Sequence, residues 1–132
     1  MQVDHYVTND AIELLGNRRF RLIGRIDEVI NSGGIKLHPQ QIERKLSQVL
    51  NMHFFIGAIV DETLGEKVIL ALKYSPSLKL DKILEKIREF SKLETYEIPK
   101  SIIILPDFVE TESGKIRRKQ TLLIDPISVL DL

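Results

Sequence analysis

The sequence Glu-Ser-Gly-Lys-Ile-Arg-Arg-Lys occupies residues 112–119 and follows an apolar run, Ile102–Leu105, that ends at Pro106. Such a run predicts a buried strand, and the polar residues after it predict a loop. Gly114 has no Cβ atom, so the backbone can turn sharply and a ligand can come close. Lys115 would then be a mobile cation at the loop tip, suited to phosphate or carboxylate oxygens. Taken alone, a Gly-Lys pair in a polar turn is most often a solvated surface lysine.

A second informative stretch, FRLIGRIDEVINSGGIKL, lies upstream at residues 20–37. It contains Gly-Arg-x-Asp, with Arg25 and Asp27, and then a Ser-Gly-Gly turn with Gly33 and Gly34. Two adjacent glycines permit positive φ, so residues 29–37 are expected to form a hairpin. Read from the residues alone, the arginine and the aspartate are a surface ion pair of little energetic value.

Together, in this order and at this spacing, the two stretches resemble the C-terminal domain of the adenylate-forming superfamily. This superfamily includes acyl-CoA synthetases, luciferases and the adenylation domains of peptide synthetases. The shared pattern is Gly-Arg-x-Asp, a glycine-containing hairpin, a helix with Glu43, and Gly-Lys-Ile near the end. The resemblance implies that residues 1–26 are the end of a larger N-terminal domain and that residues 27–132 form a C-terminal lid domain.

The expected fold class is α+β, with a small three-stranded sheet flanked by helices plus a short two-stranded hairpin. Three apolar runs predict the strands of the sheet: residues 54–60, 68–72 and 102–105. Apolar residues at helical spacing predict helices from about Pro39 and from about Asp81, and a short helix is expected over residues 117–123. Residues from Asp125 onward are expected to form a tail.

The resemblance implies a nucleotide site near the N-terminus of the chain. In the family, an aspartate at the position of Asp10 binds the ribose hydroxyls of ATP, and the arginine matching Arg25 contacts the nucleotide. Here Asn9 replaces the glycine of the family's Thr-Gly-Asp motif. Without the resemblance, Asn9 and Asp10 read as an ordinary turn pair. The alternating residues around Gly16-Asn17 predict a hairpin in the same region.

The resemblance also implies a hinge and a channel. The residue matching Asp27 is the hinge between the large and small domains, and a hinge must absorb a large change in φ and ψ. In acyl-CoA synthetases the segment matching Gly33 and Gly34 lines the pantetheine channel of CoA, where a side chain would block the thiol. Glu43 matches a family glutamate, which is either a domain contact or a first-turn acid favoured by the helix dipole.

The reaction that the resemblance implies has two half-reactions. A carboxylate attacks the α-phosphate of ATP and expels pyrophosphate, and the acyl-AMP then reacts with a thiol, usually that of CoA. Two anions meet in the first step, so a cation that touches both stabilises the transition state. Lys115 is predicted to be that cation, as an ammonium, and Mg²⁺ would travel with ATP. Rotation about Asp27 would then replace the Lys115 loop with the glycine hairpin.

The acid itself is not readable, because the acyl pocket would lie in the larger domain. The hairpin at residues 31–36 and the approach to Lys115 look similar to bacterial 2-succinylbenzoate-CoA ligases of menaquinone synthesis. Fatty-acid and aryl-acid ligases are alternatives. A different class is a non-catalytic α+β module that binds a partner protein, which predicts that Lys115 and Asp27 tolerate substitution. The chain alone is expected to bind no cofactor and to be inactive.

Composition excludes several other functions. The 132 residues suit one domain, and 19 basic against 19 acidic residues give no charge excess for a nucleic-acid partner. The basic residues at 115–119 lack interleaved aromatics, which nucleic-acid binding favours. There is no cysteine, and the three histidines have no ligand-like spacing, so no protein-bound metal is expected. No apolar run is long enough for a membrane span, and a cytoplasmic location is expected.

Overall fold

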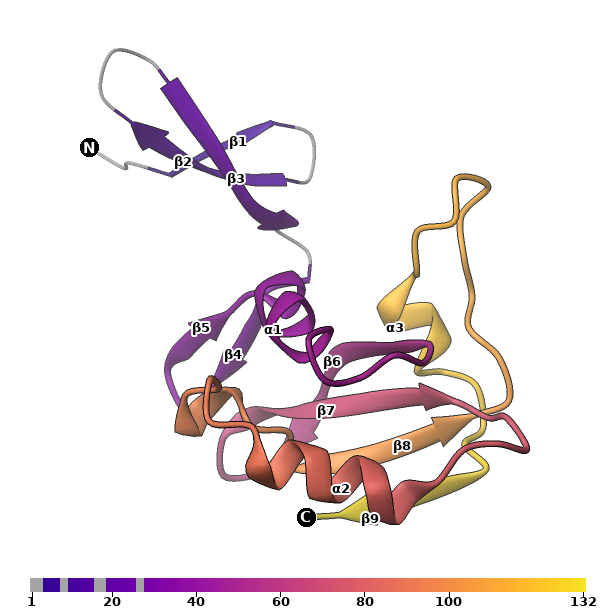
Figure 1. Cartoon of the computed structure of the whole chain (residues 1–132). Helices are drawn as coiled ribbons and strands as arrows, with labels where there is room; N and C mark the ends of the chain where they lie inside the picture. Colours follow the sequence, from indigo (N-terminus) through magenta and orange to yellow (C-terminus); the bar gives the residue numbers. More distant parts are fainter. Residues whose placement is uncertain (1–3, 8–9, 16–18, 26–27) are drawn as a thin grey trace.

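The N-terminal part of the chain forms a three-stranded antiparallel sheet (Figure 1). The structure is a computed structural model that describes residues 4–7, 10–15, 19–25 and 28–132, with side chains from residue 28 onward. The strands are β1 (Asp4–Val7), β2 (Asp10–Leu15) and β3 (Arg19–Arg25), in the order β1-β2-β3. The hairpin predicted from alternating residues is therefore confirmed as β2 paired with β3.

The rest of the chain is built on a six-stranded mixed sheet. Its strands are β4 (Ile30–Ser32), β5 (Ile35–Leu37), β6 (Phe54–Asp61), β7 (Gly65–Lys73), β8 (Ser101–Leu105) and β9 (Ser128–Asp131). The order is β5-β4-β7-β8-β9, and β6 also pairs with β7. Only β7 and β8 run parallel among these described pairs, and α2 lies in the connection between them.

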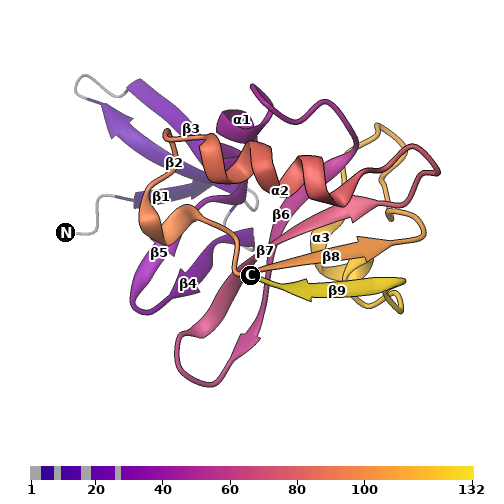
Figure 2. The ribbon, with the colours of Figure 1, turned by 60° about the horizontal axis from the view of Figure 1, so that its bottom comes forward.

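Helices cover one face of this sheet, as Figures 1 and 2 show. They are α1 (Pro39–Leu46) and α2 (Leu80–Glu89), and the short 3-10 helix η2 (Thr95–Glu97) follows α2. The helices α1 and α2 each bury one apolar stripe, which includes Ile42 and Leu46 on α1 and Ile83 and Ile87 on α2. These stripes pack on one core with alternate residues of β7. The helix starts predicted at Pro39 and near Asp81 are confirmed by the observed bounds of α1 and α2.

A second, smaller core lies on the other face of the sheet. The segment that follows β8 folds over that face and ends in the short helix α3 (Arg118–Thr121). Phe108 packs edge-on against Phe55 of β6, with ring centroids 5.0 Å apart. The continuous apolar run in β7 is explained by these two cores, because Val68, Leu70 and Leu72 face the first core while Ile69 and Ala71 face the second.

The α+β class and the two-stranded hairpin of β4 and β5 are confirmed, but the sheet has six strands where three were predicted. Ser32 pairs with Gly65 and thereby joins the hairpin to β7. The predicted tail contains β9, which pairs with β8 through Ile102 and Leu130. A short polar strand at a sheet edge carries too weak a local pattern to be recognised without its partner.

Candidate functional site

Lys115 lies at the exposed tip of a closed loop between β8 and α3. The Thr111 amide donates to the Lys115 carbonyl at 2.8 Å, and the Gly114 amide donates to the Thr111 carbonyl at 2.9 Å. The Lys115 amide in turn donates to Thr111 Oγ1 at 3.1 Å. Gly114 has φ of 86°, a left-handed conformation that favours glycine. The turn predicted at this glycine is therefore present, and it presents the lysine to solvent.

The base of this loop is fixed to the second core. The Arg117 amide donates to the Val109 carbonyl at 2.8 Å. Thr121 is fully buried at 0% exposure, and its hydroxyl donates to the Arg117 carbonyl at 2.7 Å while accepting from the Val109 amide at 2.9 Å. Ile116, the neighbour of Lys115, packs against the same core. The loop thus combines an anchored base with an exposed cationic tip.

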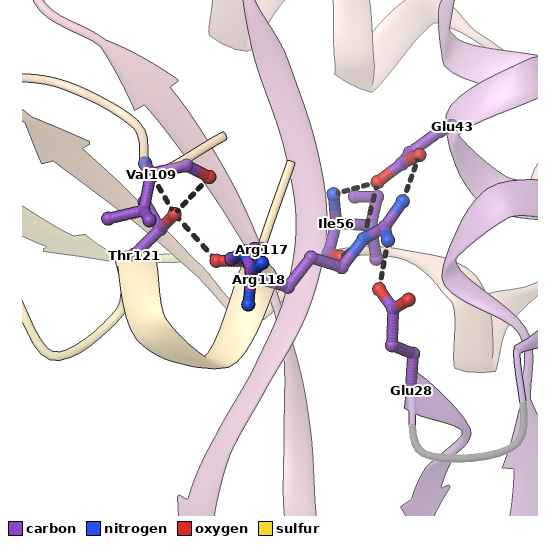
Figure 3. Close-up of polar contacts among 7 residues, drawn as sticks. All are labelled: Glu28, Glu43, Ile56, Val109, Arg117, Arg118 and Thr121. Atoms are coloured by element: carbon purple, nitrogen blue, oxygen red, sulfur yellow. Dashed lines mark hydrogen bonds and ion pairs between the residues drawn. The ribbon is translucent and has the colours of Figure 1, made fainter. Parts of the chain in front are cut away.

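Arg118 joins the end of the loop to three separate parts of the fold, as Figure 3 shows. Its Nη2 donates to Glu43 Oε1 at 2.6 Å, and its Nε lies 3.1 Å from both Glu43 Oε2 and the carbonyl oxygen of Ile56. Its Nη1 pairs with Glu28 Oε2. The Ile56 amide also donates to Glu43 Oε2, at 2.8 Å. One guanidinium therefore contacts α1, β6 and the residue that follows Asp27.

Burial and pairing act in opposite directions on the charges of this cluster. The side chains of Arg118, Glu28 and Glu43 are only 12%, 12% and 21% exposed. Burial raises the pKa of Glu43 above its ordinary value, and this effect outweighs the hydrogen bonds from Arg118 and the Ile56 amide. Burial alone would lower the pKa of Arg118, but the two carboxylates outweigh burial and raise it. Arg118 is therefore a permanent cation between two acids.

The two nucleotide-binding candidates come together in the N-terminal sheet. Asp10, the first residue of β2, is the cross-strand partner of Arg25, the last residue of β3. The strands therefore bring these positions side by side although they are far apart in sequence. The predicted hinge, Asp27, lies outside the described residues.

Gly33 and Gly34 form the predicted turn between β4 and β5, with φ values of 60° and 87°. The Gly33 amide donates to the Leu64 carbonyl at 2.8 Å, so the turn is held against the β6–β7 connection. A Cβ atom at Gly33 would lie 3.3 Å from Leu64 Cδ2, whereas one at Gly34 would meet nothing within 4 Å. Figure 1 shows that this hairpin and the Lys115 loop lie at different ends of the domain.

The Arg118 cluster is the part of the site that sequence reasoning missed. Glu43 is not a first-turn acid, because α1 has no acidic residue in its first turn. The partners of Arg118 lie 75 and 90 residues away in the chain, and such separations leave no spacing pattern. In the sequence, Arg118 was recognised only as one of several basic residues.

Within the part of the chain that the structure describes, no group of three or more His, Asp or Glu residues could hold a metal ion.

Comparison with known proteins identifies the class of the fold. No protein-family model matches the chain. Over 119 residues it is 34% identical to pseudomonine synthase PmsE of Pseudomonas entomophila, covering 87% of this chain and 19% of that protein. It is 29% identical to a vibriobactin-specific 2,3-dihydroxybenzoate-AMP ligase of Vibrio cholerae, covering 84% of this chain and 21% of the relative. The chain thus spans about a fifth of the length of these curated relatives.

Solved structures agree with the sequence relatives. The crystal structure of an AMP-forming acyl-CoA synthetase-like protein from Dyadobacter fermentans superposes with a TM-score of 0.67 at 33% identity, covering 88% of this chain and 34% of that chain. The o-succinylbenzoate CoA synthetase of Bacillus subtilis shares the fold, with a TM-score of 0.71 at 22% identity and coverage of 95% and 25%. The chain matches the C-terminal domain of adenylate-forming enzymes, and its relatives are AMP-forming acyl-CoA and aryl-CoA ligases. Its relatives are named for acids as different as oxalate and 4-chlorobenzoate.

No helix among the described residues is long and apolar enough to cross a membrane.

Proposed function

We propose that this chain is the mobile C-terminal part of a ligase that activates a carboxylic acid with ATP and transfers the acyl group to CoA. The observation that carries the proposal is the Lys115 loop, whose closed and anchored base presents a single exposed lysine. The family of the chain supports it, because relatives are named as acyl-CoA synthetases and AMP ligases. The larger N-terminal domain of the same enzyme would supply the acyl pocket.

In the first half-reaction, Lys115 would contact the substrate carboxylate and the α-phosphate oxygens of ATP. The carboxylate oxygen bonds to the α-phosphorus as the bond to the pyrophosphate oxygen breaks. Negative charge collects around that phosphorus, and an ammonium fixed nearby stabilises it more strongly in the transition state than in the ground state. Asp10 and Arg25 would hold the ribose and the nucleotide from their neighbouring strand ends. Mg²⁺ would enter with ATP.

In the second half-reaction, the thiol of CoA displaces AMP from the acyl-AMP. We propose that rotation about Asp27 withdraws the Lys115 loop and brings the turn of Gly33 and Gly34 to the active site. The loop and the hairpin lie at different ends of the domain, which supports this exchange (Figure 1). One rotation can then move the loop away from the active site and bring the hairpin to it. Glycine at both positions leaves space for the pantetheine arm of CoA.

Several classes of carboxylic acid are candidates for the activated substrate. 2-Succinylbenzoate is the first candidate, because the hairpin at residues 31–36 and the approach to Lys115 look similar to those ligases of menaquinone synthesis. Aryl acids, fatty acids and small dicarboxylates are the alternatives, in keeping with relatives and structural neighbours that are named for 4-chlorobenzoate, fatty acyl groups and oxalate. The acyl pocket of the larger domain would decide among them.

The test measures acid-dependent pyrophosphate release by the enzyme that contains this chain, across a panel of acids that includes 2-succinylbenzoate. Lys115→Ala should lose most of the release with the preferred acid, yet still form thioester from supplied acyl-AMP. Lys119→Ala is the matched control, because Lys119 is also exposed and lies outside the loop. Undiminished release by Lys115→Ala would refute the role of the lysine and favour the non-catalytic, partner-binding alternative.

A further inference from the structure

The Arg118 cluster connects the two moving parts of the proposed mechanism. Arg118 lies three residues after Lys115, and its guanidinium pairs with Glu28, the residue directly after the hinge candidate Asp27. A hinge turns the whole lid, but the lysine must arrive at one place for adenylation. The orientation of the Lys115 loop must therefore be fixed relative to the hinge.

We propose that Arg118, held by Glu28 and Glu43, is a positioning residue for adenylation that fixes the Lys115 loop relative to the hinge. The inference rests on the proposed function, since it needs Lys115 to act in that half-reaction. Arg118 would not touch the substrate. It would act by keeping the base of the loop in one orientation as the lid turns.

The geometry of the guanidinium suits this role. Its planar group binds both oxygens of Glu43 through Nε and Nη2, and Nη1 remains for Glu28. The guanidinium donates hydrogen bonds in fixed directions, so it sets the orientation of its partners as well as their distance. A lysine at the same position would supply one point charge. The additional contact of Nε with the Ile56 carbonyl ties the same group to β6, which pairs with β7.

The loop can transmit this orientation to its tip. Hydrogen bonds run from the Arg117 amide to Val109 and from the Thr111 amide to the Lys115 carbonyl, so the two arms of the loop are joined at base and tip. The isolated bridge between Glu110 and Ile116 joins them in between. A shift of Arg118 would therefore displace the lysine instead of being absorbed within the loop. A displacement of about 1 Å can slow a reaction by about 100-fold.

The test is a double-mutant cycle in the enzyme that contains this chain, using Lys115→Ala, Arg118→Lys and both together. Arg118→Lys should slow pyrophosphate release by at least about tenfold and leave thioester formation from supplied acyl-AMP within about twofold. In the Lys115→Ala background it should cause no further loss, because Arg118 acts through that lysine. Arg44→Lys is the matched control, since Arg44 is exposed on the same helix as Glu43.

Glu28→Gln gives a second test with a smaller change in shape, and it is used if Arg118→Lys fails to fold in a thermal unfolding scan. It should show the same selective loss. Equal losses in both half-reactions, or losses that multiply in the double variant, would show that the cluster only stabilises the fold and would overturn the positioning role. A Lys115→Ala variant with full pyrophosphate release would instead overturn the proposed function, so the two failures are distinguishable.

Discussion

Single residues in the buried cluster show how desolvation competes with pairing. Two carboxylates share one guanidinium, so ionising both leaves a net negative charge in a poorly solvated place. Burial therefore raises the pKa of Glu43 despite its hydrogen bonds with Arg118 and the Ile56 amide, and the nearby charge of Glu28 adds to this effect. The cluster orients groups at some cost in stability, as buried ion pairs often do.

The raised pKa of Glu43 predicts a particular pH dependence. A carboxyl whose folded pKa lies above its ordinary value of 4.5 contributes its full stability below that value and loses it as pH rises through the folded pKa. The free energy of unfolding of the wild type, minus that of Glu43→Gln, should therefore fall as pH rises from below 4.5 toward neutrality. Urea unfolding of both proteins across this range measures the difference. A difference that grows with pH would show that pairing with Arg118 lowers the pKa instead.

Removal of Arg118 should be much more damaging than removal of an exposed arginine. Arg118→Ala leaves Glu28 and Glu43 without their shared cation, and breaking a buried pair in this way costs about 3–5 kcal/mol. Since Glu43 is 21% exposed, we expect the low end of that range. Arg44→Ala, on the exposed side of α1, should change the free energy of unfolding by less than about 0.5 kcal/mol. Similar small effects of both substitutions in chemical denaturation would contradict the burial argument.

Between elements, the close approach of α3 to β6 depends on one glycine. A Cβ atom at Gly57 would lie 3.0 Å from Leu122 Cδ1 and 3.2 Å from Phe55 Cε1, both tighter than ordinary contact. Gly57→Ala should therefore lower the free energy of unfolding by about 1–3 kcal/mol, the usual cost of overpacking. In a Leu122→Ala background the penalty should shrink, because the nearest atom is gone. An unchanged penalty in that background would place the strain elsewhere.

Elements with strong local patterns were predictable, and elements that depend on partners were not. β7 was readable because every residue from Val68 to Leu72 is buried between two cores, so its apolar run is unbroken. β9 was not, since its residues are mostly exposed and its strand form depends on pairing with β8. The same division holds in the candidate site. The turn at Gly114 was readable from its own glycine, but the contacts of Arg118 depend on acids that the fold brings to it.

Across the whole molecule, the proposed reaction requires one domain to use two faces in turn. The β4–β5 hairpin and the loop between β8 and α3 lie at different ends of the domain (Figure 1). The chain between Arg25, at the end of β3, and Glu28, in the Arg118 cluster, is where the proposed rotation must occur. In the proposal, that short stretch connects the N-terminal sheet, with the candidate nucleotide-binding positions Asp10 and Arg25, to the domain that would turn.

Freezing that stretch should separate the half-reactions. Asp27→Pro fixes φ of residue 27 near −65° and also restricts Ile26, so the hinge loses most of its freedom. In the enzyme that contains this chain, the variant should retain one half-reaction and slow the other strongly, because each uses a different orientation of the lid. Pyrophosphate release and thioester formation from supplied acyl-AMP are measured separately. Asp27→Ala, which leaves φ free, should retain both. Equal losses of both activities in Asp27→Pro would mean that residue 27 supports the fold and is not the hinge.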